Sequence, residues 1–172
     1  SLERLRLLLC LTVVDMRATG PNVWNNWKAE LLRELYGATV DVLSGGQLTQ
    51  DHIPRVKAAK EALQARLTDW PKADIEAQLG RGYPGYWLTF DDEALERQAR
   101  LMRTAELEHR PLTVEIRVVS DLDVTEVTIY TQDHPGLFSR IAGAFAAVSA
   151  SIVDAKVFTT TEGMALDVFW LQ

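Results

Sequence analysis

The stretch of this sequence best suited to hold a small ligand is Thr131-Gln132-Asp133-His134-Pro135-Gly136-Leu137-Phe138. It joins a strand-like run to a helix-like one. Proline suits the first turn of a helix, and glycine lets a ligand approach the backbone closely. The N–H groups of that turn attract a carboxylate, and Asp133 could either cap them or bind an ammonium group. An ordinary strand-to-helix turn with a capping aspartate explains the same spacing.

A second residue with chemical potential is Asp15, which follows the apolar run Leu5–Val14. Burying an unpaired carboxylate is costly, so a buried Asp15 needs a partner. Arg17 or a nearby backbone N–H would serve, and so would a divalent metal ion. A single carboxylate does not hold a catalytic metal, which typically needs several ligands.

Composition and charge argue against several other functions. The 172 residues are 47% apolar and 24% charged, with a net charge of −6. This profile indicates a folded protein that suits neither a nucleic acid nor an anionic membrane. The glycine-rich run Gly80–Tyr86 lacks the lysine and the spacing of a phosphate-binding loop, so we interpret it as a turn between helices. Trp24 and Trp27 are interpreted as core packing. The single Cys10 fits a reducing compartment such as the cytoplasm.

Helical spacing of the apolar residues predicts that the first part of the chain is all-helical. The predicted helices cover about 2–18, 23–37, 52–68, 72–79 and 93–109, and residues 38–50 are ambiguous. The first helix is apolar on nearly every side, which predicts burial inside a helical bundle. Gly20-Pro21 and Gly45-Gly46 are predicted breaks. Asp91 or Asp92 is predicted to cap the last of these helices.

After Pro111 the apolar period changes from about 3.6 to 2. Val114, Ile116 and Val118 alternate with polar residues, and a turn at 121–123 leads into a second alternating run, which together predict a hairpin. A helix over 135–149 and strands over 151–159 and 164–171 follow. The expected fold class is therefore α+β, an all-helical segment followed by a small α/β layer.

The stretch Val124–Leu171, with its Asp-x-Pro-Gly-Leu-Phe turn, resembles the opening of an ACT domain. ACT domains have a ferredoxin-like βαββαβ order and bind amino acids beside enzymes. The resemblance implies ligand-binding roles for Asp133, His134, Gly136 and Leu137. It extends to Asp154, for which a solvated strand position is an equal alternative. The family pattern has a further helix and strand, so we expect an incomplete domain whose uncovered sheet face and edge contact another chain.

The stretch Leu11–Leu32 resembles the end of the HD phosphohydrolase domain in bifunctional uridylyltransferase/uridylyl-removing enzymes. In that family a His, an adjacent His-Asp pair and a later Asp hold the metal, and Asp15 matches the later Asp. None of His52, His109 and His134 stands in a His-Asp pair, and the Gly-Ser…Asp-x-Asp pattern of a nucleotidyltransferase is absent. The resemblance implies a divalent metal, Mg²⁺ or Mn²⁺, for the whole enzyme. This chain alone is expected to hold no metal and to be inactive.

The resemblance covers nearly the whole chain and divides it into three parts. Residues 1–50 would end the HD domain, residues 51–111 would be a helical linker, and residues 112–172 would be a partial ACT domain with a preceding strand. The implied enzyme is cytoplasmic, adds uridylyl groups to the PII nitrogen-signalling protein and removes them when glutamine is plentiful. Glutamine would be the ACT ligand. The alternatives are the ACT module of a guanosine tetraphosphate synthetase/hydrolase and a ligand-free dimerisation module.

Overall fold

The computed structural model describes residues 2–19, 24, 26–43 and 52–172. Its first part is helical: α1 (Leu2–Thr19), α2 (Asn26–Leu43), α3 (His52–Arg66), α4 (Lys72–Arg81), α5 (Pro84–Thr89) and α6 (Asp92–Leu107). The second part contains β1 (Leu112–Val119), a 3-10 turn at Ser120–Leu122, β2 (Val124–Gln132), α7 (Leu137–Ala147), β3 (Ile152–Thr159) and β4 (Met164–Leu171). The predicted α+β class, with a helix between strands of one sheet, is confirmed.

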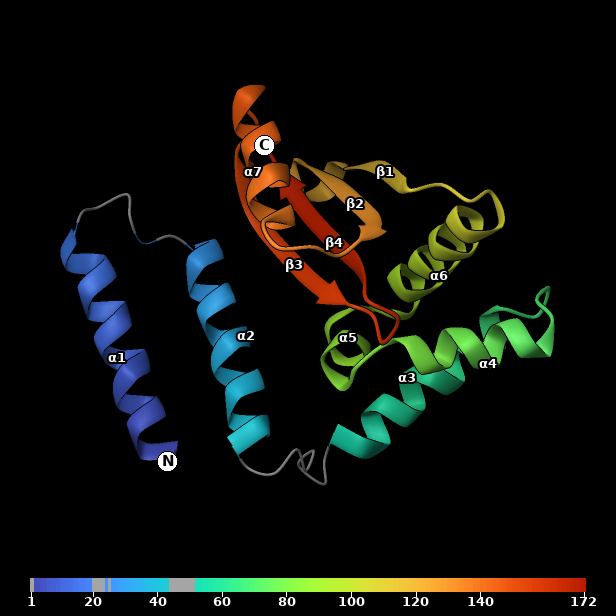
Figure 1. The fold of residues 1–172 in the computed structure, drawn as a ribbon, viewed down its shortest axis with the longest axis horizontal. Coiled ribbons are helices and arrows are strands. Elements are labelled where there is room, and N and C mark those ends of the chain that lie inside the picture. The colour runs from blue at the N-terminus through green and yellow to red at the C-terminus, as the bar shows by residue number, and fades with distance from the viewer. Residues whose placement is uncertain (1, 20–23, 25, 44–51) are drawn as a thin grey trace.

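The four strands form one antiparallel sheet in the order β1-β2-β4-β3. Alternation along each strand sends successive side chains to opposite faces. Ile129 and Phe169 therefore pack toward α7, whereas Tyr130 and Leu166 join the core of the helical layer formed by α3–α6. Figure 1 shows the sheet between α7 on one face and helices α3–α6 on the other. The predicted hairpin of β1 and β2 is confirmed, with Ile116 paired to Val127.

The helical layer is held by a continuous apolar core. Leu63 of α3, Trp87 of α5, and Leu95 and Met102 of α6 are almost completely buried in it. The predicted cap of α6 is confirmed for Asp91, whose Oδ1 accepts a hydrogen bond from the Ala94 N–H at 2.8 Å. Because Tyr130 and Leu166 belong to the same core, α3–α6 pack directly against the sheet. The predicted boundaries at residues 50 and 111 stay predictions.

Two helices differ from the sequence-based expectation. Helix α2 continues through Gly37, its predicted end, to Leu43, so the first part of the ambiguous stretch 38–50 is helical. Helix α5 lies inside the stretch that was interpreted as a turn, because Tyr86 and Trp87 anchor it in the helical core. The predicted breaks at Gly20-Pro21 and Gly45-Gly46 fall outside the described residues.

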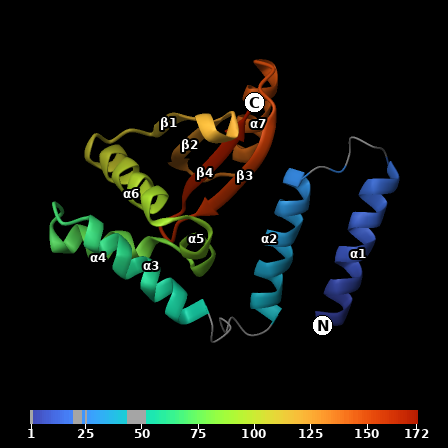
Figure 2. The ribbon, with the colours of Figure 1, turned by 180° about the vertical axis from the view of Figure 1, so that it is seen from behind.

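Helix α1 is not buried, contrary to the sequence-based prediction. None of its residues is buried, and Leu7, Leu8, Leu11 and Val14 are between 59% and 66% exposed. The reason is that α1 packs mainly against α2, at the side of the molecule away from the helical layer (Figure 2). Among the helices in the described part of the chain, none is both long and apolar enough to cross a membrane.

Candidate functional site

The predicted ligand-binding turn lies between the end of β2 and the start of α7. The Asp133 N–H donates to the Gly163 carbonyl at 3.1 Å, and Asp133 Oδ2 accepts from the Thr159 hydroxyl at 2.7 Å. Both partners come from the β3–β4 hairpin. Of the two alternatives for Asp133, capping of α7 is therefore wrong: its carboxylate is hydrogen-bonded to a strand residue 26 positions away.

Helix α7 begins without a side-chain cap. Gly136 occupies the N-cap position in the left-handed conformation, with φ of 85°, and no side chain is hydrogen-bonded there. Pro135 precedes the helix instead of occupying its first turn, a small correction to the sequence-based expectation. Glycine suits this position because a left-handed backbone is strained for other residues. No side chain therefore caps the first turn of α7, in which the Leu137 N–H donates to the His134 carbonyl at 3.1 Å.

Two other residues predicted at this turn, His134 and Leu137, differ in their exposure to solvent. His134 is exposed, and its Nδ1 lies 3.2 Å from the Pro135 carbonyl oxygen. Leu137 is half-buried, and both His134 and Leu137 line a groove beside α7. The structure thus brings Asp133, His134, Gly136 and Leu137 into one short segment.

Asp154 lies apart from that segment. It pairs with Trp170, whereas the next residue, Ala155, pairs with Phe169 beneath α7. Asp154 therefore belongs to the opposite face of the sheet, and its Oδ1 accepts a hydrogen bond from the Ala155 N–H at 2.8 Å. The register does not bring its carboxylate to the α7 turn.

A residue that the sequence analysis missed is Asp167, in the middle of β4. It is 1% exposed and lies on the α7 face of the sheet, paired with Ile129 and Val157. Its Oδ1 has no hydrogen-bond partner among the described residues. Burial, and secondly the negative charge of Asp133, raise the pKa of Asp167 to about 7. The available signal was a single aspartate within the apolar run 164–171.

The β3–β4 turn also connects the candidate site to the helical layer. Arg81, at the end of α4, lies 2.6 Å from Glu106 of α6 and 3.5 Å from Glu162 of this turn. The Arg81 carbonyl accepts from the Thr161 N–H at 2.9 Å. Because Gly163 of the same turn accepts from the Asp133 N–H, one four-residue turn contacts both the candidate site and the helices.

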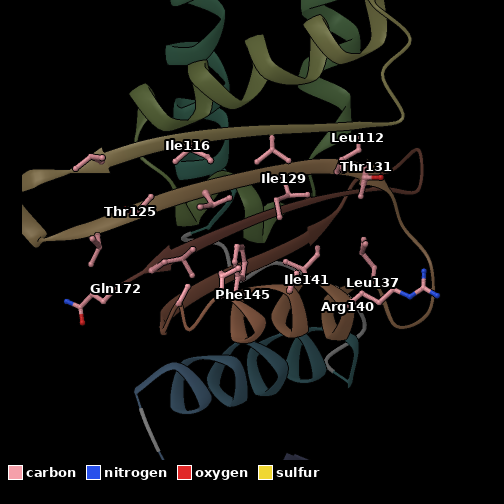
Figure 3. A pocket seen from close by; sticks show the side chains of 18 of the residues that line it. Leu112, Ile116, Thr125, Ile129, Thr131, Leu137, Arg140, Ile141, Phe145 and Gln172 are labelled. Carbon is pink, nitrogen blue, oxygen red and sulfur yellow. The ribbon is translucent and has the colours of Figure 1, made fainter.

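An apolar groove of about 740 Å³ runs between α7 and the outer half of the sheet. Figure 3 shows Leu112 and Ile116 of β1 facing it across from Ile141 and Phe145 of α7. Ile116 and Val118 are 67% and 71% exposed. The predicted uncovered sheet face is present in this structure.

Asp15 does not form part of a metal site in the described chain. Its side chain is exposed, and Arg17 lies over the Trp24 ring at 5.6 Å from its centroid. The described residues contain no group of three or more His, Cys, Asp or Glu that could hold a metal ion. The predicted burial of this carboxylate is wrong because Asp15 belongs to α1, none of whose residues is buried. The Trp27 side chain is outside the described part of the structure.

Comparison with known proteins identifies longer relatives of this chain. It is 57% identical over 172 residues to the bifunctional uridylyltransferase/uridylyl-removing enzyme of Azospirillum brasilense. It is 49% and 50% identical to the enzymes of the same name from Gluconobacter oxydans and Rhodospirillum rubrum. Each match covers 100% of this chain.

The chain corresponds to a stretch of the bifunctional uridylyltransferase/uridylyl-removing enzymes. The resemblance to these enzymes that was stated from the sequence is thus confirmed. The chain spans about 18% of the length of these relatives. No family model matches the chain, and no solved structure matches it.

Proposed function

We propose that this chain is a regulatory part of a bifunctional uridylyltransferase/uridylyl-removing enzyme, and that its Asp133–Leu137 turn binds glutamine. The observation that supports this proposal most directly is that the Asp133 carboxylate and the uncapped start of α7 lie within one short segment. The two ends of a free amino acid have matching charges. Its carboxylate would bind the N–H groups at the start of α7, and its ammonium group would bind Asp133.

The whole protein would add uridylyl groups to the PII signalling protein in the cytoplasm and remove them when glutamine is plentiful. Removal would be a metal-assisted hydrolysis of a phosphodiester. The described residues of this chain do not fit a metal ion. The residues that bind the Mg²⁺ or Mn²⁺ ion, and the catalytic residues for uridylyl transfer and for uridylyl removal, would therefore lie in other parts of the longer protein. This chain alone would be inactive.

Communication between the glutamine site and the rest of the enzyme would pass through the β3–β4 turn. This turn is hydrogen-bonded to Asp133 on one side and to Arg81 on the other. Glutamine would act as an effector only if it favours one arrangement of these contacts over another. Helices α3–α6, which share a core with the sheet, would carry the change.

A second candidate function, a dimerisation module without a ligand, is favoured by the exposed apolar groove beside α7. Contiguous exposed apolar surface is typical of an interaction site. Self-association through this groove is compatible with glutamine binding. The third alternative, a guanosine tetraphosphate enzyme, receives no support from the names of the relatives.

Thermal unfolding of the 172-residue chain with millimolar glutamine tests the proposal, because a ligand that prefers the folded state raises its melting temperature. We expect glutamine to raise it and glutamate and asparagine to raise it less. Asp133→Ala should abolish the rise, whereas Asp92→Ala, on an exposed aspartate of α6, should preserve it. Asp154→Ala should also preserve it, because the strand register keeps this carboxylate away from the α7 turn. An equal response to all three amino acids would contradict a glutamine-specific site.

A further inference from the structure

Asp167 is a buried carboxylate for which the described residues supply no compensating cation. Burial raises its pKa most, the charge of Asp133 raises it further, and only the backbone N–H of Phe158 acts in the opposite direction. Among the described residues, no cationic side chain contributes to this balance. A buried ionised carboxylate normally requires a charge partner or several hydrogen bonds. Asp167 Oδ1 nevertheless has no hydrogen-bond partner in the described part of the chain.

The sheet places Asp167 next to the candidate site. Asp167 pairs with Ile129 and Val157, and the next row on the same face consists of Thr131, Ala165 and Thr159. These rows are about 7 Å apart, since a strand rises about 3.4 Å per residue. The hydrogen bond from Thr159 holds the Asp133 carboxylate at that second row. On β4, Ala165 precedes Asp167 in the same alternation and occupies that second row, beside Thr159.

We infer that Asp167 is a second carboxylate of the effector site and that it binds the ammonium group of the amino acid together with Asp133. This inference rests on the proposed binding of glutamine at the Asp133–Leu137 turn. Asp133 is exposed and provides the entrance, whereas Asp167 forms the buried end. The ligand then supplies the positive charge that the described residues do not place beside Asp167.

This arrangement also explains how the site would select a free amino acid. An ammonium group has three hydrogen-bond donors, and Asp133 and Asp167 offer acceptor oxygens from two neighbouring rows of the sheet. A ligand without the α-amino group leaves both carboxylates uncompensated. We therefore assign to Asp167 the discrimination between glutamine and its analogue without the amino group, 4-carbamoylbutanoate.

The test is calorimetric titration of the 172-residue chain with glutamine and with 4-carbamoylbutanoate. Asp167→Asn keeps the shape of the side chain and removes its charge. It should weaken glutamine binding about ten-fold or more, in line with the loss of a charge-assisted hydrogen bond. It should leave the weak binding of 4-carbamoylbutanoate unchanged. The matched control is Asp154→Asn, on the neighbouring strand and the opposite face, which should bind glutamine like the wild type.

A second measurement uses the wild-type chain alone, so that its result does not depend on whether the Asp167→Asn variant folds. In the wild-type chain at pH 6.5, glutamine should move the NMR signal of the Asp167 carboxyl carbon toward its ionised position, and 4-carbamoylbutanoate should not. Glutamine binding that is equally tight in Asp167→Asn, or that leaves this signal in place, overturns the inference while the proposed function stands. A wild-type chain that binds no glutamine overturns both.

Discussion

The guanidinium of Arg81 lies 2.6 Å from the Glu106 carboxylate and 3.5 Å from that of Glu162, so a single side chain joins α4, α6 and the β3–β4 turn. Its side chain is 12% exposed, and Glu106 also accepts a hydrogen bond from the Tyr130 hydroxyl at 3.1 Å. The contact between the helical layer and the sheet thus includes a charged cluster as well as the apolar core.

Removal of this guanidinium should destabilise the chain measurably. Arg81→Ala leaves Glu106 and Glu162 without their shared cation, which should lower the free energy of unfolding by roughly 1–3 kcal/mol. The control is Arg100→Ala, whose pairs with Asp69 and Glu96 are more exposed to solvent, so the loss of stability should be smaller. Urea unfolding of both variants provides the measurement. Equal losses would show that the partly buried position of Arg81 does not matter.

Asp167 should make the stability of the chain depend on pH. Its pKa of about 7 in the folded chain exceeds the ordinary value of 3.8. The folded state therefore holds the proton more tightly, and stability present below pH 4 is lost as the pH rises through 7. At pH 8, Asp167→Asn should be more stable than the wild type by on the order of 2–4 kcal/mol.

Urea unfolding between pH 4 and pH 8 checks this expectation. The difference between wild type and Asp167→Asn should grow with pH and nearly vanish at pH 4. The control Asp154→Asn should follow the wild type at every pH. A constant difference across the range would show that the effect of the substitution does not come from ionisation of Asp167.

Gly82 should not tolerate a side chain. A Cβ at this position would clash with Tyr86 Cδ1 and would lie 2.8 Å from Trp87 Nε1, which donates to the Gly82 carbonyl at 2.9 Å. Both aromatic rings are buried and cannot move freely. Gly82→Ala should therefore cost about 1–3 kcal/mol through overpacking.

The matched control is Gly85→Ala, because a Cβ there has no atom within 4 Å and the residue lies in α5. That change should be neutral or stabilise the chain by up to about 1 kcal/mol. Melting temperatures of the two variants separate the predictions. If Gly82→Ala melts with the wild type, the turn before α5 is less closely packed than the structure indicates.

The groove beside α7 should mediate self-association. Ile116 is 67% exposed on the outer strand, and a charge at its position would be buried in any contact made there. Analytical ultracentrifugation of the wild type should show concentration-dependent dimers, and Ile116→Asp should shift them to monomer. The control Ile53→Asp changes an apolar side chain that is 55% exposed on α3. Dimers that persist in Ile116→Asp, or disappear in both variants, would place the contact elsewhere.

The sequence by itself determined the class of the fold and most of its elements, because apolar periodicity and capping are local properties. The change of period after Pro111 predicted the sheet, and position alone narrowed the cap of α6 to Asp91 or Asp92, of which the structure shows Asp91. The same local reasoning placed Asp133 at the correct turn and missed α5, where Gly82 and Pro84 suggested an irregular segment. The similarity to uridylyltransferase/uridylyl-removing enzymes came from resemblance over the whole chain, because apolar periodicity carries no information about an enzyme family.

The tertiary structure alone decided the partners of these residues. Thr159 is 26 positions from Asp133, so their hydrogen bond depends on the hairpin register and not on local sequence. Asp167 became a buried carboxylate because pairing with β2 and β3 turned it toward α7. Arg81, at the end of α4, contacts Glu162 because the helical layer packs against the sheet beside the β3–β4 turn. Long-range strand pairing, which sequence spacing does not specify, brings together the groups from which the candidate site is built.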